Sequence, residues 1–304
     1  MAKTELFARK QPGGVFTVVR EDLCTGNIWF VNSATGTNSV GYGRNPDAPF
    51  DTLAYAISQA AAGDRIYVME GHAEDVTAAG TITQSKAGLQ IIGLGYGARR
   101  PTITFTTNAA ATVAVSAAST LIRNFIFDMT GVDAVTTGIN WTGADGILED
   151  CYILAADAGG QAVRAITIGA AAHRLKIRRC RVEAPNDGAT HMVYHAGGAS
   201  DVEITDNVFE VDVDTAAIHN DTALAARWLV KNNVFNILAG AGKSLVMHAN
   251  TTGSVVGNHT YITANIAAGG SMTAAAMLKS ANYAAELAHV DGSSQIDPAA
   301  GGWA

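Results

Sequence analysis

Residues 204–209 read Ile-Thr-Asp-Asn-Val-Phe, and residues 230–235 read Val-Lys-Asn-Asn-Val-Phe, so one pattern returns after 26 residues. Six segments of the chain share its main feature, an apolar residue at the first and at the last of six positions. The third residues of these segments, which we take as anchors, are Asn124, Asp150, Arg179, Asp206, Asn232 and Asn258. Successive anchors are 26, 29, 27, 26 and 26 residues apart. Such regular spacing indicates an internal repeat of about 26 residues.

Each repeat also contains a second strand-like segment upstream of its anchor. These segments alternate apolar residues with small or polar ones, as half-buried strands do, and they span 138–142, 165–169, 192–195 and 245–248. A unit of this size cannot bury its apolar face alone, so neighbouring units must stack. The sequence lacks both the 3.6-residue periodicity of helical repeats and the Leu-x-x-Leu-x-Leu pattern of leucine-rich repeats. The repeat therefore predicts an all-β fold, a single right-handed parallel β-helix.

An amphipathic helix is predicted to close the N-terminal end of this β-helix. Residues 52–62 bring four apolar residues to one helix face, namely Leu53, Ala56, Ile57 and Ala60. We expect Asp51 to cap the start of this helix and Gly63 to end it. Such a cap would protect the exposed strand edge of the first rung.

The segments that follow the predicted helix read as the strands of the opening rungs. They are 65–69, 89–93 and 102–105. The repeat is lost after Thr263, where the chain becomes rich in Ala and Gly. We therefore predict three parts: an N-terminal arm over 1–27, the β-helix over 28–263, and a C-terminal cap or tail over 264–304.

Composition and charge exclude several functional classes. The chain has 304 residues, of which 48% are hydrophobic, and a net charge of −7. Its densest basic cluster, Arg174 to Arg181, alternates basic with apolar residues and is typical of a solvated strand face rather than a nucleic-acid footprint. No apolar run approaches the ~18 residues of a membrane span. We expect neither nucleic-acid nor membrane binding.

Three segments near the N-terminus resemble the entry segment of pectin-lyase-like β-helix proteins. They are Ile-Trp-Phe-Val-Asn-Ser-Ala-Thr-Gly-Thr (28–37), Asn-Pro-Asp-Ala-Pro-Phe-Asp-Thr-Leu (45–53) and Gly-Asp-Arg-Ile-Tyr-Val (63–68). In that superfamily such a stretch leads through a capping helix into the first rung. With the repeats, the resemblance covers Ile28 to Thr263 and implies the fold. It implies no single function, because the superfamily includes lyases, hydrolases, tailspikes and adhesins.

The charged anchors are the nearest approach to the site of a polysaccharide lyase or hydrolase. Asp150, Arg179 and Asp206 would stack on consecutive rungs, with Glu149 and Arg178 beside them. Paired carboxylates serve acid–base hydrolysis of glycosides, but alternating charges on stacked rungs also form plain ion-pair ladders. The Asn-Thr-Asp and Gly-Asp-Asp motifs of β-helix hydrolases are missing, and so are long loops that would wall a sugar cleft. We favour the ion-pair ladder.

Three histidines form a second candidate constellation. His195, His219 and His248 each follow an apolar strand residue, so the spacing predicts one column of stacked imidazoles. Such a column could bind a metal or respond to pH. A polar ladder or an interface is the more common use of such residues, so neither a metal nor a cofactor is predicted.

The anchor pattern also places two of the three cysteines. The fourth position of the six segments reads Phe125, Cys151, Cys180, Asn207, Asn233 and His259. Cys151 and Cys180 would therefore be neighbours on adjacent rungs. We expect reduced thiols in a turn, and a disulfide between them is the alternative. The one Gly-rich loop that might suggest phosphate binding, Gly93-Leu-Gly-Tyr-Gly97, precedes no helix, lacks the spacing of a phosphate-binding loop and reads as a turn.

Together these features favour a non-catalytic virion structural protein. The Ala-, Thr- and Gly-rich sequence without appended domains resembles bacteriophage virion proteins of the β-helix fold, and a signal-peptide pattern is absent from its start. We predict a capsid decoration (cement) protein or a tail component, made in the host cytoplasm. It would assemble as a homotrimer on a major capsid or tail protein. The alternatives are a polysaccharide lyase or hydrolase and a carbohydrate-binding tail adhesin.

Overall fold

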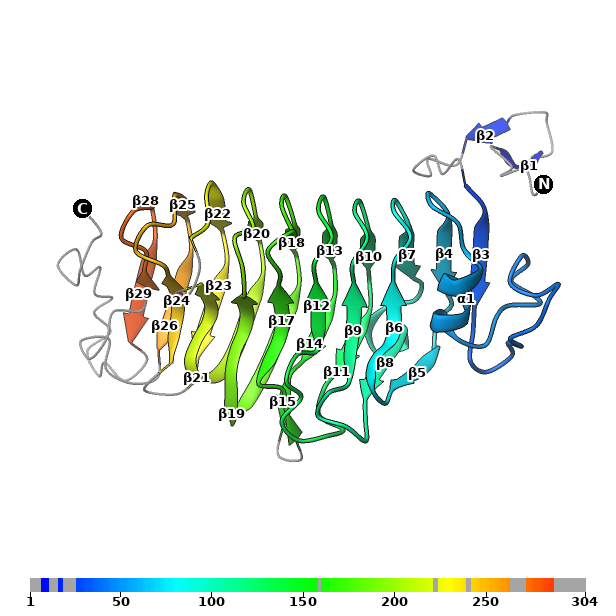
Figure 1. Ribbon diagram of the computed structural model, residues 1–304, viewed down its shortest axis with the longest axis horizontal. Coiled ribbons are helices and arrows are strands. Elements are labelled where there is room, and N and C mark those ends of the chain that lie inside the picture. The colour runs from blue at the N-terminus through cyan, green and yellow to red at the C-terminus, as the bar shows by residue number, and fades with distance from the viewer. Residues whose placement is uncertain are drawn as a thin grey trace.

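The computed structural model describes residues 7–10, 16–18, 26–157, 160–220, 224–238, 242–262 and 272–286. Its main body is a right-handed parallel β-solenoid of about seven turns with rungs of ~27 residues, which confirms the predicted fold. Figure 1 shows the rungs stacked along the long axis of the molecule. A short antiparallel pair, β1 (Phe7–Lys10) and β2 (Phe16–Val18), precedes the solenoid.

Each complete rung contributes one strand to each of three faces. The first face is a ten-stranded parallel sheet. Its strands are β3 (Ile28–Val31), β4 (Arg65–Val68), β7 (Gln90–Gly93), β10 (Leu121–Arg123), β13 (Ile147–Glu149), β18 (Lys176–Arg178), β20 (Glu203–Thr205), β22 (Trp228–Lys231), β25 (Gly253–Val256) and β28 (Leu278–Ser280).

The second face follows the first around a tight turn. It consists of β5 (Ala73–Val76), β8 (Thr102–Phe105), β11 (Ile126–Asp128), β14 (Tyr152–Leu154), β19 (Arg181–His195), β21 (Val208–Asn220), β23 (Val234–Ile237), β26 (His259–Ile262) and β29 (Tyr283–Glu286). The long strands β19 and β21 continue into the third face, which also holds β6 (Ala79–Gln84), β9 (Thr112–Val115), β12 (Ile139–Trp141), β17 (Arg164–Ile168), β24 (Lys243–Met247) and β27 (Met272–Thr273). Beside them, β15 (Ala156–Asp157) pairs with β16 (Gly160–Gln161).

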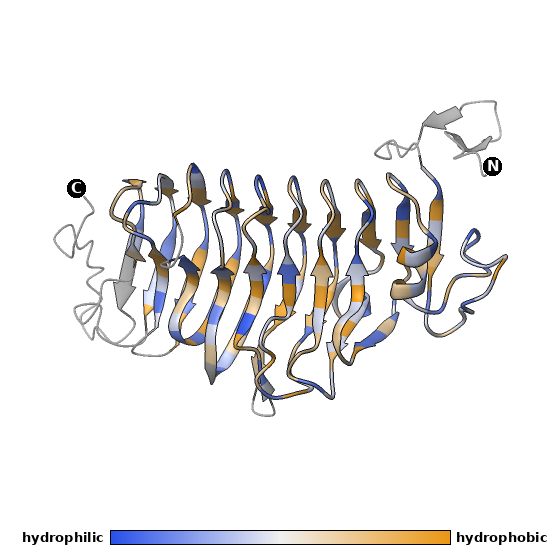
Figure 2. Cartoon of the chain, viewed as in Figure 1, coloured by the Kyte–Doolittle hydropathy of each residue, from blue (hydrophilic) through white to orange (hydrophobic). Residues whose placement is uncertain are grey.

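Alternating residues of the strands fill a continuous core. In the first face one inward column reads Ile66, Ile91, Ile122, Leu148, Ile177, Ile204, Val230 and Val255, and all eight residues are buried. Figure 2 shows the corresponding alternation of apolar and polar residues along the strands. Burying each such side chain stabilises the fold by about 1.5–3 kcal/mol, so the stacking that the repeat predicted is also the main source of stability.

The turn between the first two faces explains the repeat pattern. Its first residue has a left-handed backbone in rung after rung, with φ between 53° and 64° at Asn124, Asp150, Arg179, Asp206 and Asn232. Asn and Asp tolerate this conformation better than most residues. The next rung places Gly257 there, not Asn258, because Val256 pairs with Lys231. The sixth anchor was therefore wrong by one residue.

The residue after each turn residue is buried in the core, and the asparagines of this column form a hydrogen-bonded ladder. With the corrected register this column continues through Asn207, Asn233, Asn258 and Asn282, so His259 does not belong to it. Each amide Nδ2 donates to the Oδ1 of the next Asn, over 2.9–3.0 Å. Cys151 and Cys180 occupy the two preceding rungs of the same column as buried free thiols.

The N-terminal helix α1 (Leu53–Gln59) is shorter than predicted and is capped differently. Leu53, Ala56 and Ile57 are buried against the solenoid, as expected. Thr52, rather than Asp51, is the N-cap, because its Oγ1 accepts from the Tyr55 amide. The Glu74 carboxylate accepts two further amides of the first turn. The helix ends at Gln59 with Ala60 as its C-cap, so Gly63 did not supply the predicted stop.

The solenoid continues beyond the predicted boundary at residue 263. Strands β27, β28 and β29 pair in parallel with β24, β25 and β26 and add one more rung. Residues 264–271 and 287–304, which complete the predicted C-terminal cap or tail, lie outside the described residues, as does most of the predicted arm over 1–27.

Candidate functional site

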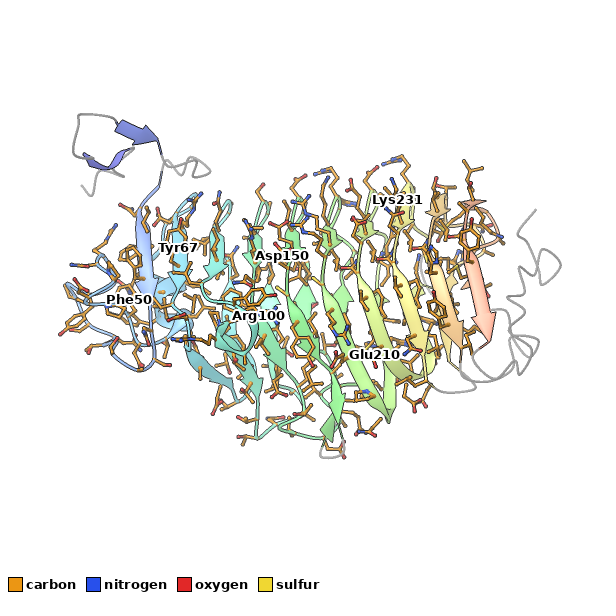
Figure 3. All side chains as sticks on the ribbon, turned by 180° about the vertical axis from the view of Figure 1, so that it is seen from behind. Phe50, Tyr67, Arg100, Asp150, Glu210 and Lys231 are labelled. Atoms are coloured by element: carbon orange, nitrogen blue, oxygen red, sulfur yellow. The ribbon has the colours of Figure 1, made fainter. Side chains whose placement is uncertain are left out.

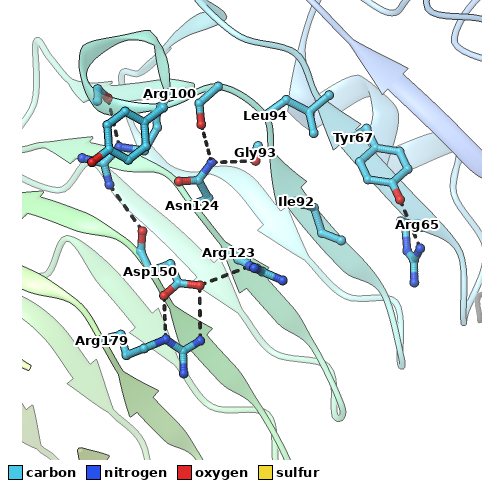
Figure 4. Close-up of a pocket in the computed structure, with 13 residues that line it drawn as sticks. Arg65, Tyr67, Ile92, Gly93, Leu94, Arg100, Arg123, Asn124, Asp150 and Arg179 are labelled. Carbon is cyan, nitrogen blue, oxygen red and sulfur yellow. Dashed lines mark hydrogen bonds and ion pairs between the residues drawn. The ribbon is translucent and has the colours of Figure 1, made fainter. Parts of the chain in front are cut away.

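A cleft of about 840 Å³ opens on the outside of the solenoid near its N-terminal end. Its floor comes from β4, β7 and β10, and one wall is the connection between β7 and β8, which includes the short 3-10 helix η1 (Gly97–Arg99). Figure 3 labels Tyr67, Arg100 and Asp150 from this region, and Figure 4 shows the cleft in close-up. A volume of this size is in the range of small-molecule sites.

The wall is the Gly-rich stretch that the sequence analysis interpreted as a plain turn. Asn124 holds it in place, because its Nδ2 donates to the Gly93 carbonyl at 2.9 Å and to the Gly95 carbonyl at 3.0 Å. A Cβ on Gly93 would lie 2.3 Å from the Asn124 carbonyl oxygen, so glycine is required there. The cleft is thus walled by a short loop, pinned by one amide, rather than by the long loops whose absence the sequence analysis noted.

Aromatic rings lie at two places in the cleft. Tyr96, in the loop, is 92% exposed. Tyr67 lies on β4, where its ring stacks against Phe30 with 5.9 Å between ring centroids. Its hydroxyl accepts a hydrogen bond from Arg65 Nη1 at 3.1 Å. The cleft thus offers one exposed ring on its wall and one fixed ring on its floor.

Four arginines line the cleft, and they differ in what they contact. Arg65 is only 2% exposed and donates twice to Gln90 Oε1, at 2.9 and 2.7 Å. Arg100 is half-buried and donates to two main-chain carbonyls, Gly97 at 3.0 Å and Asp150 at 3.3 Å. Among the described residues no carboxylate forms an ion pair with Arg100. The other two arginines belong to a charge network.

That network joins two adjacent carboxylates to three arginines. Arg179 pairs with Asp150 through Nε at 2.7 Å and with Glu149 through Nη2 at 2.9 Å. Arg123 lies 3.2 Å from Asp150 and 3.8 Å from Glu149, and Arg178 Nε lies 2.7 Å from Glu149. The two carboxylates lie on one rung and are shared by guanidinium groups from the rungs on either side. This arrangement fixes Arg123 and Arg179 at the edge of the cleft.

The protonation of Asp150 follows from these contacts. Burial acts to raise the pKa of its carboxyl group, but the hydrogen bond and charge of Arg179, followed by those of Arg123, outweigh burial and hold this pKa below its ordinary value. The same pairing raises the pKa of Arg179. A general acid needs a raised carboxyl pKa, so Asp150 is suited to orienting arginines rather than to donating a proton.

The structure brings together two of the three residues predicted as an acid–base set. Asp150 and Arg179 are in direct contact at the cleft, whereas Asp206 lies one rung further and accepts a hydrogen bond from Asn232. Asp206 does not line the cleft. The sequence analysis missed Arg100, Arg123 and both tyrosines. The Arg99-Arg100 pair directly after the Gly-rich stretch was the one available signal for this site.

The three predicted histidines do not form a column. His195 is in register with Asn220, while His219 is in register with Tyr194. Successive strand residues face opposite ways, so His195 points inward and His219 outward. The prediction of one column was wrong because β21 places its histidine one position earlier in the rung. Within the described residues no group of three or more His, Cys, Asp or Glu side chains could hold a metal ion.

The individual histidines have local partners. His195 accepts from the Ala199 amide at Nε2, so its Nδ1 carries the proton and donates to Asn220 Oδ1 at 2.6 Å. His219 stacks on His191 with 4.1 Å between ring centroids. Burial, followed by the charges of His219 and Arg164, lowers the pKa of His191 to about 3. His248 Nδ1 accepts from the Asn250 amide.

Comparison with known proteins gives information about the fold and none about the function. No protein-family model and no curated protein matches the chain, and no helix within the described ranges has the length and apolar character needed to cross a membrane. Among solved structures, native GH136 lacto-N-biosidase from Eubacterium ramulus is similar, with a TM-score of 0.51 and 13% sequence identity. Its selenomethionine derivative gives a TM-score of 0.47 at the same identity. The match covers 86% of this chain and 55% of the lacto-N-biosidase, so this chain spans about half the length of that protein and shares its parallel β-solenoid architecture.

Proposed function

We propose that this protein binds polysaccharide in the cleft between β4, β7, β10 and the Gly93–Pro101 loop. The observation that carries the proposal is the combination of aromatic rings and planar polar side chains in one open lateral cleft. Tyr67 and Tyr96 provide the rings, and the arginines with Asn124 provide fixed hydrogen-bonding groups.

This combination suits the chemistry of a sugar chain. A pyranose ring presents a face of C–H groups, which packs on an aromatic ring, and an edge of hydroxyl groups. Guanidinium and amide groups make paired, directional hydrogen bonds to such an edge. The cleft is open along the solenoid surface, so a chain could cross it without an end having to enter.

The structural relative supports the class of ligand and nothing finer. Its name is that of a glycoside hydrolase, and its structure is similar to the parallel β-solenoid of this chain, so this architecture is compatible with carbohydrate chemistry. Its specific activity is not transferred to this chain, because the two share 13% sequence identity and this chain covers 55% of that protein. The low pKa of Asp150 also favours binding over acid–base hydrolysis at this cleft.

The proposal is tested by screening the purified protein against immobilised polysaccharides and measuring the affinity of the best ligand by calorimetry. We expect Tyr67→Ala and Tyr96→Ala each to weaken binding about 5-fold to 30-fold, since each removes a stacking surface worth about 1–2 kcal/mol. Tyr261→Ala is the matched control, because Tyr261 is exposed on β26 outside the cleft. Absence of binding across the screen, or equal losses in all three variants, would refute the proposal.

The virion role remains a prediction from the sequence. It is compatible with polysaccharide binding if the protein is a tail adhesin that binds surface glycans. Quantitative mass spectrometry of particles purified from the source tests it. A copy number near that of the major shell protein supports decoration, and a few copies per particle support the tail. Absence of the protein from particles would contradict any virion role.

A further inference from the structure

We infer that the polysaccharide bound in this cleft carries an anionic group, a carboxylate or a sulfate ester, and that Arg100 and Arg123 bind it. The inference rests on the proposed function. It adds the charge of the ligand and names the residues that bind the charged group. It comes from the distribution of charge in and around the cleft.

The cleft is a basic site on an acidic protein. The chain has a net charge of −7, but the residues that line the cleft include four arginines and a single carboxylate, that of Asp150. The adjoining Arg178 and Glu149 add one charge of each sign, so the local excess stays positive. A cleft of one sign with low-dielectric walls concentrates ions of the opposite sign.

The ion pairs of the network determine which arginines can still bind an anionic ligand. Arg178 and Arg179 each make a contact of 2.9 Å or shorter with a carboxylate. Arg100 donates hydrogen bonds to two carbonyl oxygens and lies over the Tyr152 ring at 5.9 Å. Among the described residues no carboxylate neutralises its charge. Arg123 shares its Nε with Asp150 and Glu149 at 3.2 and 3.8 Å, and its side chain is 45% exposed.

Geometry holds these two arginines ready for a ligand. Arg100 is tied at one side to Gly97 within its own loop and at the other to the Asp150 carbonyl two rungs further along the solenoid. Arg123 is held from the opposite direction by the network, as Figure 4 shows. Each guanidinium keeps N–H donors that no described residue occupies. Planar guanidinium groups bind carboxylate and sulfate oxygens through paired, charge-assisted hydrogen bonds, so an anionic sugar fits the cleft better than a neutral one.

The test compares matched ligands that differ only in charge. Oligogalacturonate is measured against its fully methyl-esterified form, and dextran sulfate is measured against dextran. We expect the charged member of at least one pair to bind 10-fold or more tightly than its neutral partner. The pair that shows this difference identifies the anion as a carboxylate or as a sulfate. Polyglutamate serves as an anion without sugar, and we expect it to bind at least 10-fold more weakly than the preferred charged glycan.

Variants assign the effect to the two arginines. Arg100→Gln and Arg123→Gln keep hydrogen-bonding capacity and remove charge, and each should reduce the preference for the charged ligand about 10-fold. Arg174→Gln is the control, because Arg174 is exposed, pairs with Asp145 and lies outside the cleft. Circular dichroism verifies that each variant is folded.

The possible failures are distinguishable. Equal binding of charged and neutral glycans, or an unchanged preference in both cleft variants, would overturn the inference and leave the proposed function standing. Polyglutamate binding as tightly as the charged glycan would also overturn it, since the cleft would then recognise charge without sugar. If none of the glycans binds in this panel or in the wider screen, the inference and the proposed function both fail.

Discussion

Replacing Asn233 with alanine should cost this protein more stability than almost any other single polar substitution. Asn233 is fully buried in the middle of the asparagine ladder. Its Oδ1 accepts from the backbone amide and from the side-chain amide of Asn207, both at 3.0 Å. Its Nδ2 donates to the Ile204 carbonyl and to Asn258 Oδ1, both at 2.9 Å. One side chain therefore connects three rungs.

The expected magnitude follows from the groups left without partners. Truncation leaves the buried backbone amide of Asn207 with no acceptor, while the side-chain amide of Asn207 keeps the Ile177 carbonyl. The Asn258 amide oxygen keeps the backbone amide of residue 233 as a donor. A buried polar group that loses its partner costs about 1–3 kcal/mol. One orphaned donor and two weakened acceptors give a loss of about 2–5 kcal/mol, a large part of a typical total of about 5–15 kcal/mol.

Urea unfolding followed by far-ultraviolet circular dichroism measures this loss. Asn232→Gly is the control, since Asn232 is exposed and its left-handed backbone suits glycine; it should change the free energy of unfolding by less than about 1 kcal/mol. Amide hydrogen exchange should speed up at Asn207 and stay unchanged in the rung around Ile153. A loss below about 1 kcal/mol for Asn233→Ala, at an unchanged m-value, would refute the reasoning from unpaired groups.

Three further predictions concern pH, packing and the loop. The fold favours the neutral form of His191, because the pKa of this histidine is lowered to about 3 from about 6.5 in the unfolded chain. The stabilising contribution of neutral His191 is therefore present above pH 6.5 and is lost as the pH falls toward 3. His191→Phe should therefore flatten the fall in unfolding free energy between pH 6.5 and 4, and a parallel pH profile would contradict this. Phe235→Ala removes a ring that stacks on Phe209 and should cost about 3–5 kcal/mol in urea unfolding, whereas a cost under 1 kcal/mol would show that the core closes around the gap. Gly93→Ala brings a Cβ against the backbone carbonyl of Asn124, so it should lower the unfolding free energy and, by displacing the loop, weaken glycan binding in calorimetry; unaltered affinity would mean that the loop position does not matter.

The fold could be predicted because equivalent positions of successive rungs require the same kinds of residue. Inward positions such as Ile204 and Val230 must be apolar in each rung, and the following left-handed turn favours residues such as Asp206 and Asn232. The strand register of the rung that contains β25 was harder to predict. Nothing in the local pattern distinguished Gly257 from Asn258 as the turn residue, because both suit that backbone. Pairing with β22 decided between them.

The cleft could not be predicted because one of its walls is a loop outside the repeat and because residue types change along its columns, as where Tyr67, Ile92 and Arg123 stack. Arg100 lies in a connection between faces, Tyr67 lies on an opening strand, and Arg123 lies immediately before an anchor. The sequence analysis did find the pair Asp150 and Arg179, whose contact follows directly from stacking. It could not show that Arg100 approaches the Asp150 carbonyl, 50 residues further along the chain, since that contact depends on how the Gly93–Pro101 loop is held.

The asparagine ladder makes this molecule modular, so that its length can change in whole units. Removing residues 208–233 would join Asn207 directly to Val234, and the junction would read Ile-Thr-Asp-Asn-Val-Phe, the same six residues as in the intact chain. Asn258 would then accept the hydrogen bonds of Asn207 that Asn233 accepts in the intact chain, and the donor and acceptor groups would be of the same kind. Gene duplication or deletion of one such unit would preserve every bond type in the column. A shortened chain of this kind should fold, and an elongated one should too, which gives evolution a simple way to set the length of the rod.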